Sequence, residues 1–414
     1  MVGVTGYSAL LADEMILAGT FPTRVQVDHR RINPNNSSVD GDMYTPLHQA
    51  RLQADTVVYL FEQRLDDPVF EPAAAGLREG IALGTFYGGY TRLWLGELFC
   101  WSILTGMVQE TAPLMPDARV QQAITMLEEA ETLAEAEGLE DYRLAAIVGQ
   151  ARGHLWLGNY GTAATLASEV PTSHVLWAEY SANDPAQYNK VYALTHGDTE
   201  SVRWTVGLGT EGLRGNEEFP HWQEFVDLNL IDINPPGVSP FNTSIGNIGR
   251  QLIYSQPQAD VLVASGVEAR LIEAEVAVRN DETGAAETLL NDLRADYSFR
   301  ATVTWGVQPP AAGNELEDLT LAGDLEADLR TVAAERAREL WLTGDRAVTS
   351  RRLRWDPTVD IDLFPPKEQL AAGGDDIAFP IVLRELENNE NLAVGDACPP
   401  GQSEGSWGHP PAGA

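Results

Sequence analysis

The chain has 414 residues, of which 61 are Asp or Glu and 27 are Lys or Arg, so its formal net charge is −34. A surface this acidic is unsuited to collecting phosphates, which excludes general nucleic-acid binding and charge-driven docking on an anionic membrane. Because 44% of the residues are hydrophobic and only 21% are charged, the chain can bury a sizeable core, which excludes a disordered protein.

The cysteines and the first residues bear on the compartment. Two cysteines are too few for a disulfide-built scaffold, and Cys100, in the apolar stretch 98–101, is expected to pack as a small hydrophobic side chain. A bond between Cys100 and Cys398 would require an oxidising compartment. Residues 1–5 predict no signal peptide, and no apolar run of about 18 residues predicts a membrane span. The sequence as it stands predicts a soluble protein, or the mature part of an exported one.

Helical periodicity is the dominant signal in the first half of the chain. Apolar residues recur over 120–134 at the spacing of one helix face. A second helix is predicted over 142–156. Gly149 and Gly153 lie inside it and predict close approach by a neighbouring helix, because glycine otherwise costs helix stability. After a tight turn, a third helix that stops at Pro171 completes a helical hairpin.

A second helical hairpin is predicted further along the chain. Ser265 and Glu268 form a capping box at the start of a helix over 265–278. A polar turn at 280–282 leads into a returning helix over 286–293. Hairpins with short polar turns are typical of tetratricopeptide-type units, but the long stretch between these two excludes a simple tandem array.

Two segments interrupt the helical pattern. Residues 172–262 are rich in Pro, Gly, Asn and aromatics and contain one predicted strand, over 202–206; residues 296–323 form a second excursion. Loops of this length inside a compact domain are usually functional. A helix around 329–340 follows them, and the last stretch, 399–414, is Gly/Pro-rich and predicts a loose tail.

The usual catalytic fingerprints are absent from the sequence. There is no His-Glu-x-x-His helix, no phosphate-binding loop ending in Gly-Lys-Ser/Thr and no Gly-x-Ser-x-Gly elbow. The seven histidines lack the spacing of metal ligands. The acidic residues of 40–42 are expected to form a surface turn and those of 356–362 a solvated loop, rather than a Ca²⁺ site. We therefore predict no catalytic residue, no metal ion and no cofactor.

The tryptophans divide into two groups. Four lie in helical or strongly apolar contexts and are expected to pack in the core: Trp94, Trp101, Trp156 and Trp341. Four others lie in irregular segments beside polar residues, an arrangement that suits the apolar C–H face and polar rim of a sugar. The predicted ligand-binding residues are Trp177, Trp204, His221, Trp222 and Trp305. The alternative is that these side chains only anchor their loops to the body.

A basic cluster stands out in so acidic a chain: Arg346, Arg351, Arg352 and Arg354. We expect these arginines to pair with nearby acids and with helix C-termini. The alternative is a site for an anionic ligand or partner.

Several segments together resemble the SusD/RagB family of outer-membrane nutrient-binding lipoproteins. The most specific is 335–346, which is similar to that family's Glu-Arg-x-x-Glu-Leu…Gly-x-Arg helix and turn, and 351–353 continues it. The segment 379–392 is similar to the family's closing Pro-Ile…Glu…Asn-x-Asn-Leu. The segments 269–275 and 290–294 match its central repeat hairpin.

The resemblance implies a mainly α fold, in which tetratricopeptide-like helical hairpins form a right-handed framework and a loop-rich subdomain packs on it. No ligand residue is carried over from the motif, which is chiefly structural. The parts are one domain over 1–395, with its framework mainly over 45–171 and 264–355 and its loop-rich part mainly over 172–263 and 296–323, and a Gly/Pro-rich tail over 396–414.

The resemblance also implies a function. Family members are non-catalytic proteins on the surface of the outer membrane that bind an oligosaccharide or a peptide and pass it to a TonB-dependent, SusC-like transporter. The lipid-modified Cys that opens family precursors is not seen at the start of this sequence. The alternatives are an intracellular peptide-binding repeat scaffold and a helical glycoside hydrolase. The net charge of −34 favours a neutral glycan or a peptide over a polyanion.

Overall fold

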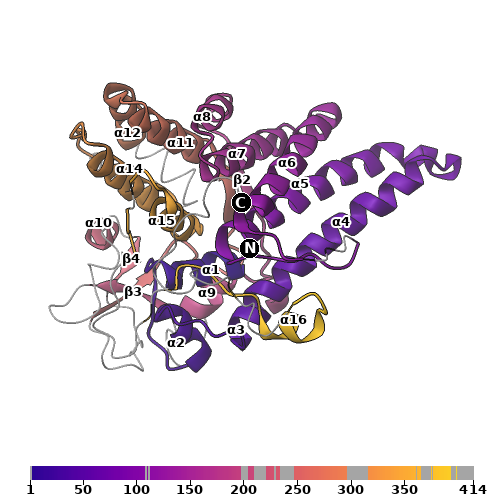
Figure 1. Ribbon diagram of the computed structural model, residues 1–414, viewed down its shortest axis with the longest axis horizontal. Helices are drawn as coiled ribbons and strands as arrows, with labels where there is room; N and C mark the ends of the chain where they lie inside the picture. The colour runs from indigo at the N-terminus through magenta and orange to yellow at the C-terminus, as the bar shows by residue number, and fades with distance from the viewer. Residues whose placement is uncertain are drawn as a thin grey trace.

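The computed structural model describes residues 2–107, 110, 112–196, 204–208, 221–227, 230–233, 247–295, 316–359, 361–364, 374, 376–392 and 398. Most of them lie in helices, and α4, α5, α6, α7, α8, α11 and α12 follow one another in an arc across the upper part of Figure 1. The mainly α fold that the sequence predicted is therefore confirmed.

The elements have the following bounds. The α-helices are α1 (Val2–Leu11), α2 (Pro22–Asp28), α3 (Ser37–Val39), α4 (Thr45–Leu65), α5 (Ala74–Leu98), α6 (Pro116–Glu137), α7 (Glu140–Trp156), α8 (Tyr160–Ser168), α9 (Lys190–Thr195), α10 (Trp222–Asp227), α11 (Gly266–Arg279), α12 (Thr283–Ala295), α14 (Leu325–Glu339), α15 (Asp345–Trp355) and α16 (Leu383–Asn388). The shorter helical segments are η1 (Asp40–Tyr44), η2 (Pro68–Ala73) and η3 (Pro185–Gln187). The strands are β1 (Ile16–Leu17), β2 (Val175–Ala178), β3 (Trp204–Leu208), β4 (Ile231–Asp232), β5 (Asn247–Gln251) and β6 (Val261–Ser265).

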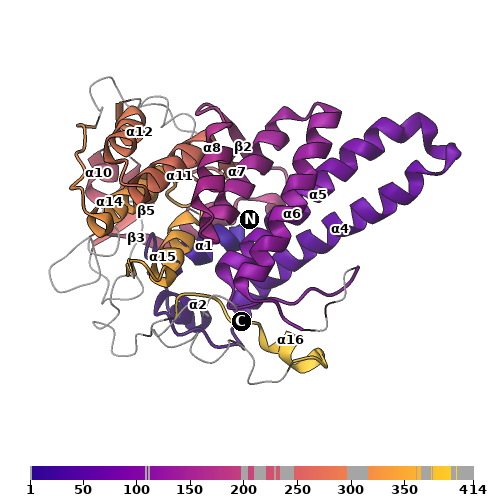
Figure 2. The ribbon, with the colours of Figure 1, turned by 45° about the horizontal axis from the view of Figure 1, so that its top comes forward.

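The helices pack as antiparallel neighbours, and α4 and α5 form a long arm that projects from the body (Figures 1 and 2). The hairpin of α7 and α8 lies where the periodicity predicted it. The close approach predicted at its glycines is confirmed, because a Cβ added to Gly149 would lie 2.8 Å from Leu127 Cδ1 and one added to Gly153 would lie 2.7 Å from Ile124 Cγ1. Glycine therefore allows α6 and α7 to pack face to face.

The hairpin of α11 and α12 is also confirmed. Ser265 caps α11, since its side chain accepts a hydrogen bond of 3.1 Å from the backbone N–H of Glu268. The polar turn between Arg279 and Thr283 then reverses the chain, with Asp281 in the left-handed region at φ 62°. The buried faces of α11, α12 and α14 share an apolar cluster of their own, separate from the larger core around α1, α5, α6 and α7.

The interruption between the hairpins contains regular structure. β3 confirms the predicted strand, displaced by two residues, and it lies inside an antiparallel sheet with the strand order β1-β3-β5-β4. A second antiparallel pair joins β2 to β6, with Trp177 opposite Leu262. This pair leads directly into α11, because β6 ends at the residue that caps that helix.

Cys100 is buried, as predicted, and the bond to Cys398 that the sequence left open is formed. The two Cα atoms lie 5.4 Å apart, although the residues are 298 positions apart in the chain. The bond ties a residue of the predicted tail to the start of the segment that follows α5.

Two acidic segments also differ from prediction. The segment 40–42 is helical rather than a turn, because η1 continues α3 into α4, and Asp42 accepts a hydrogen bond of 2.8 Å from Tyr7. Asp356, expected in a solvated loop, is 6% exposed and accepts hydrogen bonds from Arg279 at 2.6 Å and from Tyr160 at 3.1 Å. Asp360 lies outside the described residues.

Buried arginines join helices that are distant in sequence. Arg152 on α7 donates two hydrogen bonds of 2.6 Å to the carboxylate of Glu97 on α5. Arg352 on α15 binds Glu275 on α11 in the same two-point manner, also at 2.6 Å. A planar guanidinium matches a carboxylate in this geometry, which fixes both distance and orientation. We call these contacts, and the related one made by Arg351, the arginine clamps.

Arg351 on α15 clamps backbone rather than a carboxylate. It donates hydrogen bonds to the carbonyl oxygens of Glu97, at 2.6 Å, and Phe99, at 3.0 Å. These carbonyls stand at the C-terminus of α5, where backbone acceptors lack helical partners and the helix dipole favours a cation. The guanidinium also lies 4.0 Å from the ring centroid of Trp355.

The prediction for the basic cluster is thereby confirmed. Arg351 and Arg352 are buried in the clamps. Arg346 donates a hydrogen bond of 2.8 Å to the carbonyl oxygen of Ala12, and Arg354 pairs with Asp362 at 2.9 Å. These arginines bind acids and carbonyl groups of the fold, so they do not form the exposed anion site that was the alternative.

One stability prediction concerns the start of α11. A Cβ added to Gly266 would lie 1.9 Å from the backbone oxygen of Pro171, whereas one added to Gly284, at the start of α12, would meet nothing within 4 Å. We expect Gly266→Ala to destabilise the protein by about 2–4 kcal/mol, because backbone must move to admit the methyl group. Chemical denaturation of both variants measures this effect. Gly284→Ala is the matched control, and a gain of up to ~1 kcal/mol is expected for it; equal behaviour of the two variants would contradict the close approach.

A second prediction compares two Glu–Arg pairs with the same i,i+4 spacing. Glu275 is buried with Arg279 and Arg352, whereas Glu326 and Arg330 are exposed. Removing the buried carboxylate leaves Arg352 without its carboxylate partner and Arg279 with Asp356 alone, so Glu275→Gln is expected to cost about 3–5 kcal/mol. Glu326→Gln is expected to cost no more than ~0.5 kcal/mol. Urea denaturation at neutral pH distinguishes the two.

The stability that the buried Glu275 contributes depends on pH. Burial alone would raise the pKa of Glu275, but the charges of Arg352 and Arg279 outweigh it and lower this pKa from 4.5 to about 2. The stability that Glu275 contributes is therefore fully present above pH 4.5 and is lost as the pH falls toward 2. We expect the difference in unfolding free energy between the wild type and Glu275→Gln to shrink over that range; a difference constant from pH 7 to 2 would contradict this assignment.

Candidate functional site

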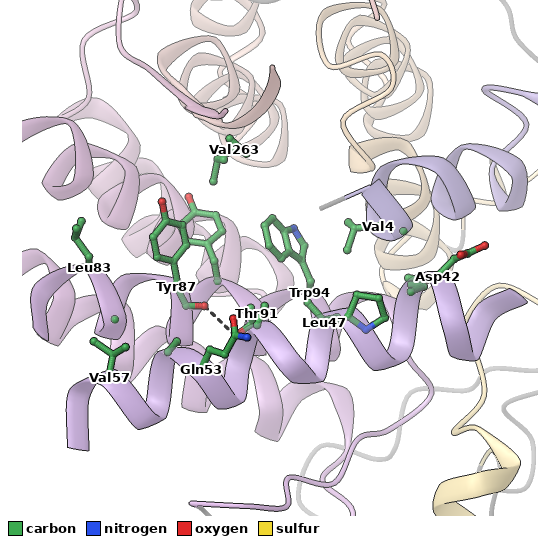
Figure 3. A pocket seen from close by; sticks show the side chains of 18 of the residues that line it. Val4, Asp42, Leu47, Gln53, Val57, Leu83, Tyr87, Thr91, Trp94 and Val263 are labelled. Atoms are coloured by element: carbon green, nitrogen blue, oxygen red, sulfur yellow. Dashed lines mark hydrogen bonds between the residues drawn. The ribbon is translucent and has the colours of Figure 1, made fainter. Parts of the chain in front are cut away.

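A pocket of about 470 Å³ lies between α4 and α5, and Figure 3 shows it from close by. One side is formed by α4 and the facing side by α5. α1 and η1 contribute residues at one end, and β2 and β6 contribute Ala178 and Val263. Figure 3 places Val263 above the aromatic side chains and Val4 with Asp42 at the end of the pocket nearest α1. The pocket therefore lies at the base of the projecting arm.

Aromatic side chains form the α5 wall. Tyr87, Tyr90 and Trp94 are separated by three and four residues, which places them on one face of the helix. Tyr90 is 1% exposed and donates a hydrogen bond of 2.7 Å to the carbonyl oxygen of Ala145. Trp94 is 6% exposed, with its ring centroid 5.6 Å from that of Tyr90. Tyr87, 44% exposed, stands at the mouth.

The phenols of this wall are neutral and already engaged. Burial raises the pKa of Tyr87 and of Tyr90 well above the usual value of 10. The hydroxyl groups of Tyr87 and Tyr142 share a hydrogen bond of 3.3 Å. Thr91 donates to the carbonyl oxygen of Tyr87 at 2.8 Å, within its own helix (Figure 3). The wall thus offers ring faces rather than free hydroxyl groups.

The α4 wall is aliphatic and built from small side chains. Ala50 and Ala54 leave room beside Leu47 and Val57. Gly84 lets α5 lie close to α4 at this point, because an added Cβ would lie 2.9 Å from Val58 Cγ2 and 3.2 Å from the backbone oxygen of Ala54. Gln53 is the exception on α4: it is exposed and directs a carboxamide toward the pocket (Figure 3).

One carboxylate lies at the α1 end of the pocket, and it is occupied. Asp42 accepts a hydrogen bond of 2.8 Å from Tyr7, and its carboxylate lies 3.7 Å from the guanidinium of Arg24. Asp55 on α4 is held by Arg92 at 2.9 Å. The pocket interior is consequently neutral.

The structure places Trp204 in the core. It lies in β3, is 1% exposed, and its ring centroid lies 5.3 Å from that of Tyr7 in an edge-to-face contact. The strand around it was predicted, but the Gly- and Pro-rich surroundings did not indicate that this strand runs through the middle of a sheet. An enclosed indole presents no face to solvent, so we do not carry Trp204 forward as a ligand contact.

The other predicted site residues are dispersed. His221 immediately precedes α10; it donates a hydrogen bond of 2.9 Å to the carbonyl oxygen of Ala334 and lies 3.6 Å from Glu224. Trp222 is the first residue of α10, and its side chain lies outside the description. Trp177 is half-buried in β2, against the apolar cluster of α11 and α12. Trp305 lies outside the described residues. Only His221 and Trp222 are brought together, as chain neighbours.

The pocket residues were missed by the sequence reasoning. Trp94 was expected in the core, and Trp94, Trp156 and Trp341 are indeed buried. The signal that could have found the pocket is the aromatic spacing of Tyr87, Tyr90 and Trp94 on one helix face. The same spacing also describes an ordinary buried face, and only the small residues of a second helix turn it into a pocket.

The described ranges contain neither a candidate metal cluster nor a candidate membrane span. There, no group of three or more His, Cys, Asp or Glu side chains is arranged to hold a metal ion. In that same part of the chain, no helix is both long and apolar enough to cross a bilayer.

Similarity to known proteins is carried by the backbone, since no protein-family model and no curated protein sequence matches the chain. A SusD/RagB family protein from Bacteroides thetaiotaomicron matches with a TM-score of 0.63 at 11% identity, over 95% of this chain and 91% of that one. The chain has the SusD fold. A SusD homologue from Bacteroides fragilis matches with a TM-score of 0.63 at 14% identity, over 93% of this chain and 90% of that one.

A third relative of the SusD fold has a functional name. The surface glycan-binding protein A from Bacteroides uniformis matches with a TM-score of 0.62 at 13% identity, over 95% of this chain and 93% of that one. These matches confirm the fold that the motifs at 269–294 and 335–392 implied. At this level of identity they establish the architecture, and the ligand has to be argued from the chain itself.

Proposed function

We propose that this SusD-fold protein is a non-catalytic, surface-exposed glycan-binding protein of the outer membrane that delivers its ligand to a TonB-dependent, SusC-like transporter. The observation that carries the proposal is the match to the surface glycan-binding protein A over nearly the whole of both chains. The proposal treats residues 1–395 as one domain, with a tail after it.

Two observations in the chain itself favour this function over the alternatives. The disulfide between Cys100 and Cys398 is typical of an oxidising compartment, which disfavours an intracellular scaffold. The buried carboxylate of Glu275 is held in an arginine clamp, and the charges of Arg352 and Arg279 lower its pKa to about 2. A carboxylate whose pKa is lowered in this way is a poor general acid, because the paired guanidinium groups oppose its protonation.

The proposed glycan contacts are the aromatic and polar residues of the interrupting segments that remain after the core is accounted for: Trp177, His221, Trp222 and Trp305. A net charge of −34 favours a neutral glycan, since a polyanion would be repelled. No exposed cluster of arginines compensates this charge in the basic segment that the sequence singled out, because its arginines are bound within the fold.

Glycan binding is the first test of this function. In affinity electrophoresis against neutral and acidic polysaccharides, we expect retention by at least one neutral polysaccharide, and no release of reducing sugar on prolonged incubation. Trp222→Ala is expected to weaken binding by about tenfold, because stacking of an aromatic ring on an apolar face is worth roughly 1–1.5 kcal/mol. Isothermal titration calorimetry with the retained glycan gives the ratio of the dissociation constants.

Tyr59→Ala provides the control for this experiment. Tyr59 is 46% exposed on α4, and Figure 1 shows α4 and α10 on opposite sides of the molecule. The control should bind as the wild type does. Sugar release by the wild type would instead favour the hydrolase, and equal binding by Trp222→Ala would remove this residue from the site.

The transporter is tested separately. Gentle solubilisation of outer membranes from the native host, followed by affinity purification of the tagged protein, is expected to recover a TonB-dependent barrel. Fractionation of the same cells tests the alternative of an intracellular scaffold. Recovery of the protein with the cytoplasmic fraction and without a barrel would support the intracellular scaffold.

A further inference from the structure

We propose that the pocket between α4 and α5 is a binding site for an aryl group, meaning a flat, neutral aromatic ring system that carries one hydrogen-bonding oxygen. This inference goes beyond the proposed function and does not depend on it. The residues proposed to contact glycan lie in β2, at α10 and in the interrupting segments, whereas the α4 and α5 walls of the pocket belong to the projecting arm.

The walls of the pocket favour a flat apolar ligand. Tyr87 and Trp94 contribute aromatic rings to the lining from α5 (Figure 3), and Ala50 and Ala54 contribute only methyl groups from α4. An aromatic ring inserted between such walls contacts carbon on both sides, and offset or edge-to-face contacts with the tyrosine and tryptophan rings add to burial. A volume of about 470 Å³ falls in the range of small-molecule sites and accommodates a two-ring system.

Among the described lining residues, two polar groups are unengaged and can orient a ligand. The indole Nε1–H of Trp94 donates no hydrogen bond to any residue that the structure describes, although the side chain is only 6% exposed. Within the same described residues, the carboxamide of Gln53 at the mouth is likewise unengaged. A donor that is largely buried gains free energy when an acceptor reaches it. A ligand oxygen can accept from Trp94, and a hydroxyl at the mouth can bond to Gln53.

The same inventory disfavours other ligands. A sugar alone would bury several hydroxyl groups here, and among the described residues Trp94, Gln53 and the remaining acceptor sites of Asp42 are too few to bond them all, since Thr91 already donates within its own helix. A charged ligand would meet no free counter-charge, because Asp42 is bound by Tyr7 and Asp55 by Arg92. A neutral aromatic ring is therefore the ligand that best fits this pocket.

The ring could come from two sources with the same chemistry. It could be a free aromatic compound, or the aryl group of a glycoside whose sugar remains outside. The mouth allows the second source, because Ala50, Gln53 and Tyr87 are exposed there. Three probes separate these sources: 2-naphthol, 2-naphthyl β-D-glucoside and glucose.

The experiment is calorimetric titration of the intact protein with each probe, supported by quenching of tryptophan fluorescence. We expect 2-naphthol to bind with a dissociation constant on the order of 0.1 mM, as its size allows, and glucose not to bind in the pocket. Binding of the glucoside as strong as that of 2-naphthol would show that a sugar can project from the mouth. Binding of 2-naphthol alone would identify the free compound as the ligand type.

Variants locate the binding. Ala50→Phe places a ring inside the pocket and is expected to weaken 2-naphthol binding at least tenfold. Gln49→Phe adds the same ring at the preceding exposed position on α4, which does not line the pocket, and should bind as the wild type does. Trp94→Phe keeps an aromatic ring but removes the N–H, so a five- to tenfold loss is expected for 2-naphthol.

Several outcomes would overturn the proposal. They are no binding of 2-naphthol up to its solubility limit, equal binding by Ala50→Phe and Gln49→Phe, or glucose binding that Ala50→Phe abolishes, which would make the pocket a sugar subsite. Failure of the aryl-group proposal can be told apart from failure of the glycan proposal. The glycan test measures polysaccharide binding by Trp222→Ala, and this variant leaves the pocket unchanged.

Discussion

Buried arginines are the constraint on which this structure depends. A guanidinium can leave water only if other groups supply its hydrogen bonds and its counter-charge, and those groups must therefore be in place when the helices pack. Of the 27 basic residues only Lys190 and Lys367 are lysine, so nearly every cation has the planar form suited to two-point pairing. Arg152 with Glu97, and Arg352 with Glu275, each link helices from distant parts of the chain. Each clamp consequently sets register as well as spacing.

The clamps also account for the geometry of the arm and its pocket. Arg92 on α5 binds Asp55 on α4 at two points, both 2.9 Å long, which holds the walls of the pocket at a fixed separation. Arg351 holds the C-terminal end of α5 against α15, so the base of the arm is tied to the body. An aromatic wall facing alanines across a rigid gap is a preformed site, and a preformed site spends little of its binding free energy on ordering.

Prediction from sequence succeeded where the signal was local. The hairpins of α7 with α8 and of α11 with α12 follow from apolar spacing, caps and turns within some 30 residues, all of which act through neighbouring parts of the chain. It did not establish the burial of Trp204: the strand around this residue was predicted, but its place in the middle of a sheet depends on β1 and β5. It also left the bond between Cys100 and Cys398 open, because the two residues are 298 positions apart.

The sequence by itself determined the helical framework, its turns, the close approach at Gly149 and the resemblance to SusD, since each rests on the order of residues along one or two neighbouring elements. Only the tertiary structure decided which arginine meets which carboxylate, that Asp356 is buried, and that Tyr87 and Trp94 face Ala50 across a cavity. The physical reason is common to all three: burial and pairing are properties of two surfaces brought together, and neither surface carries in its own sequence the identity of the other.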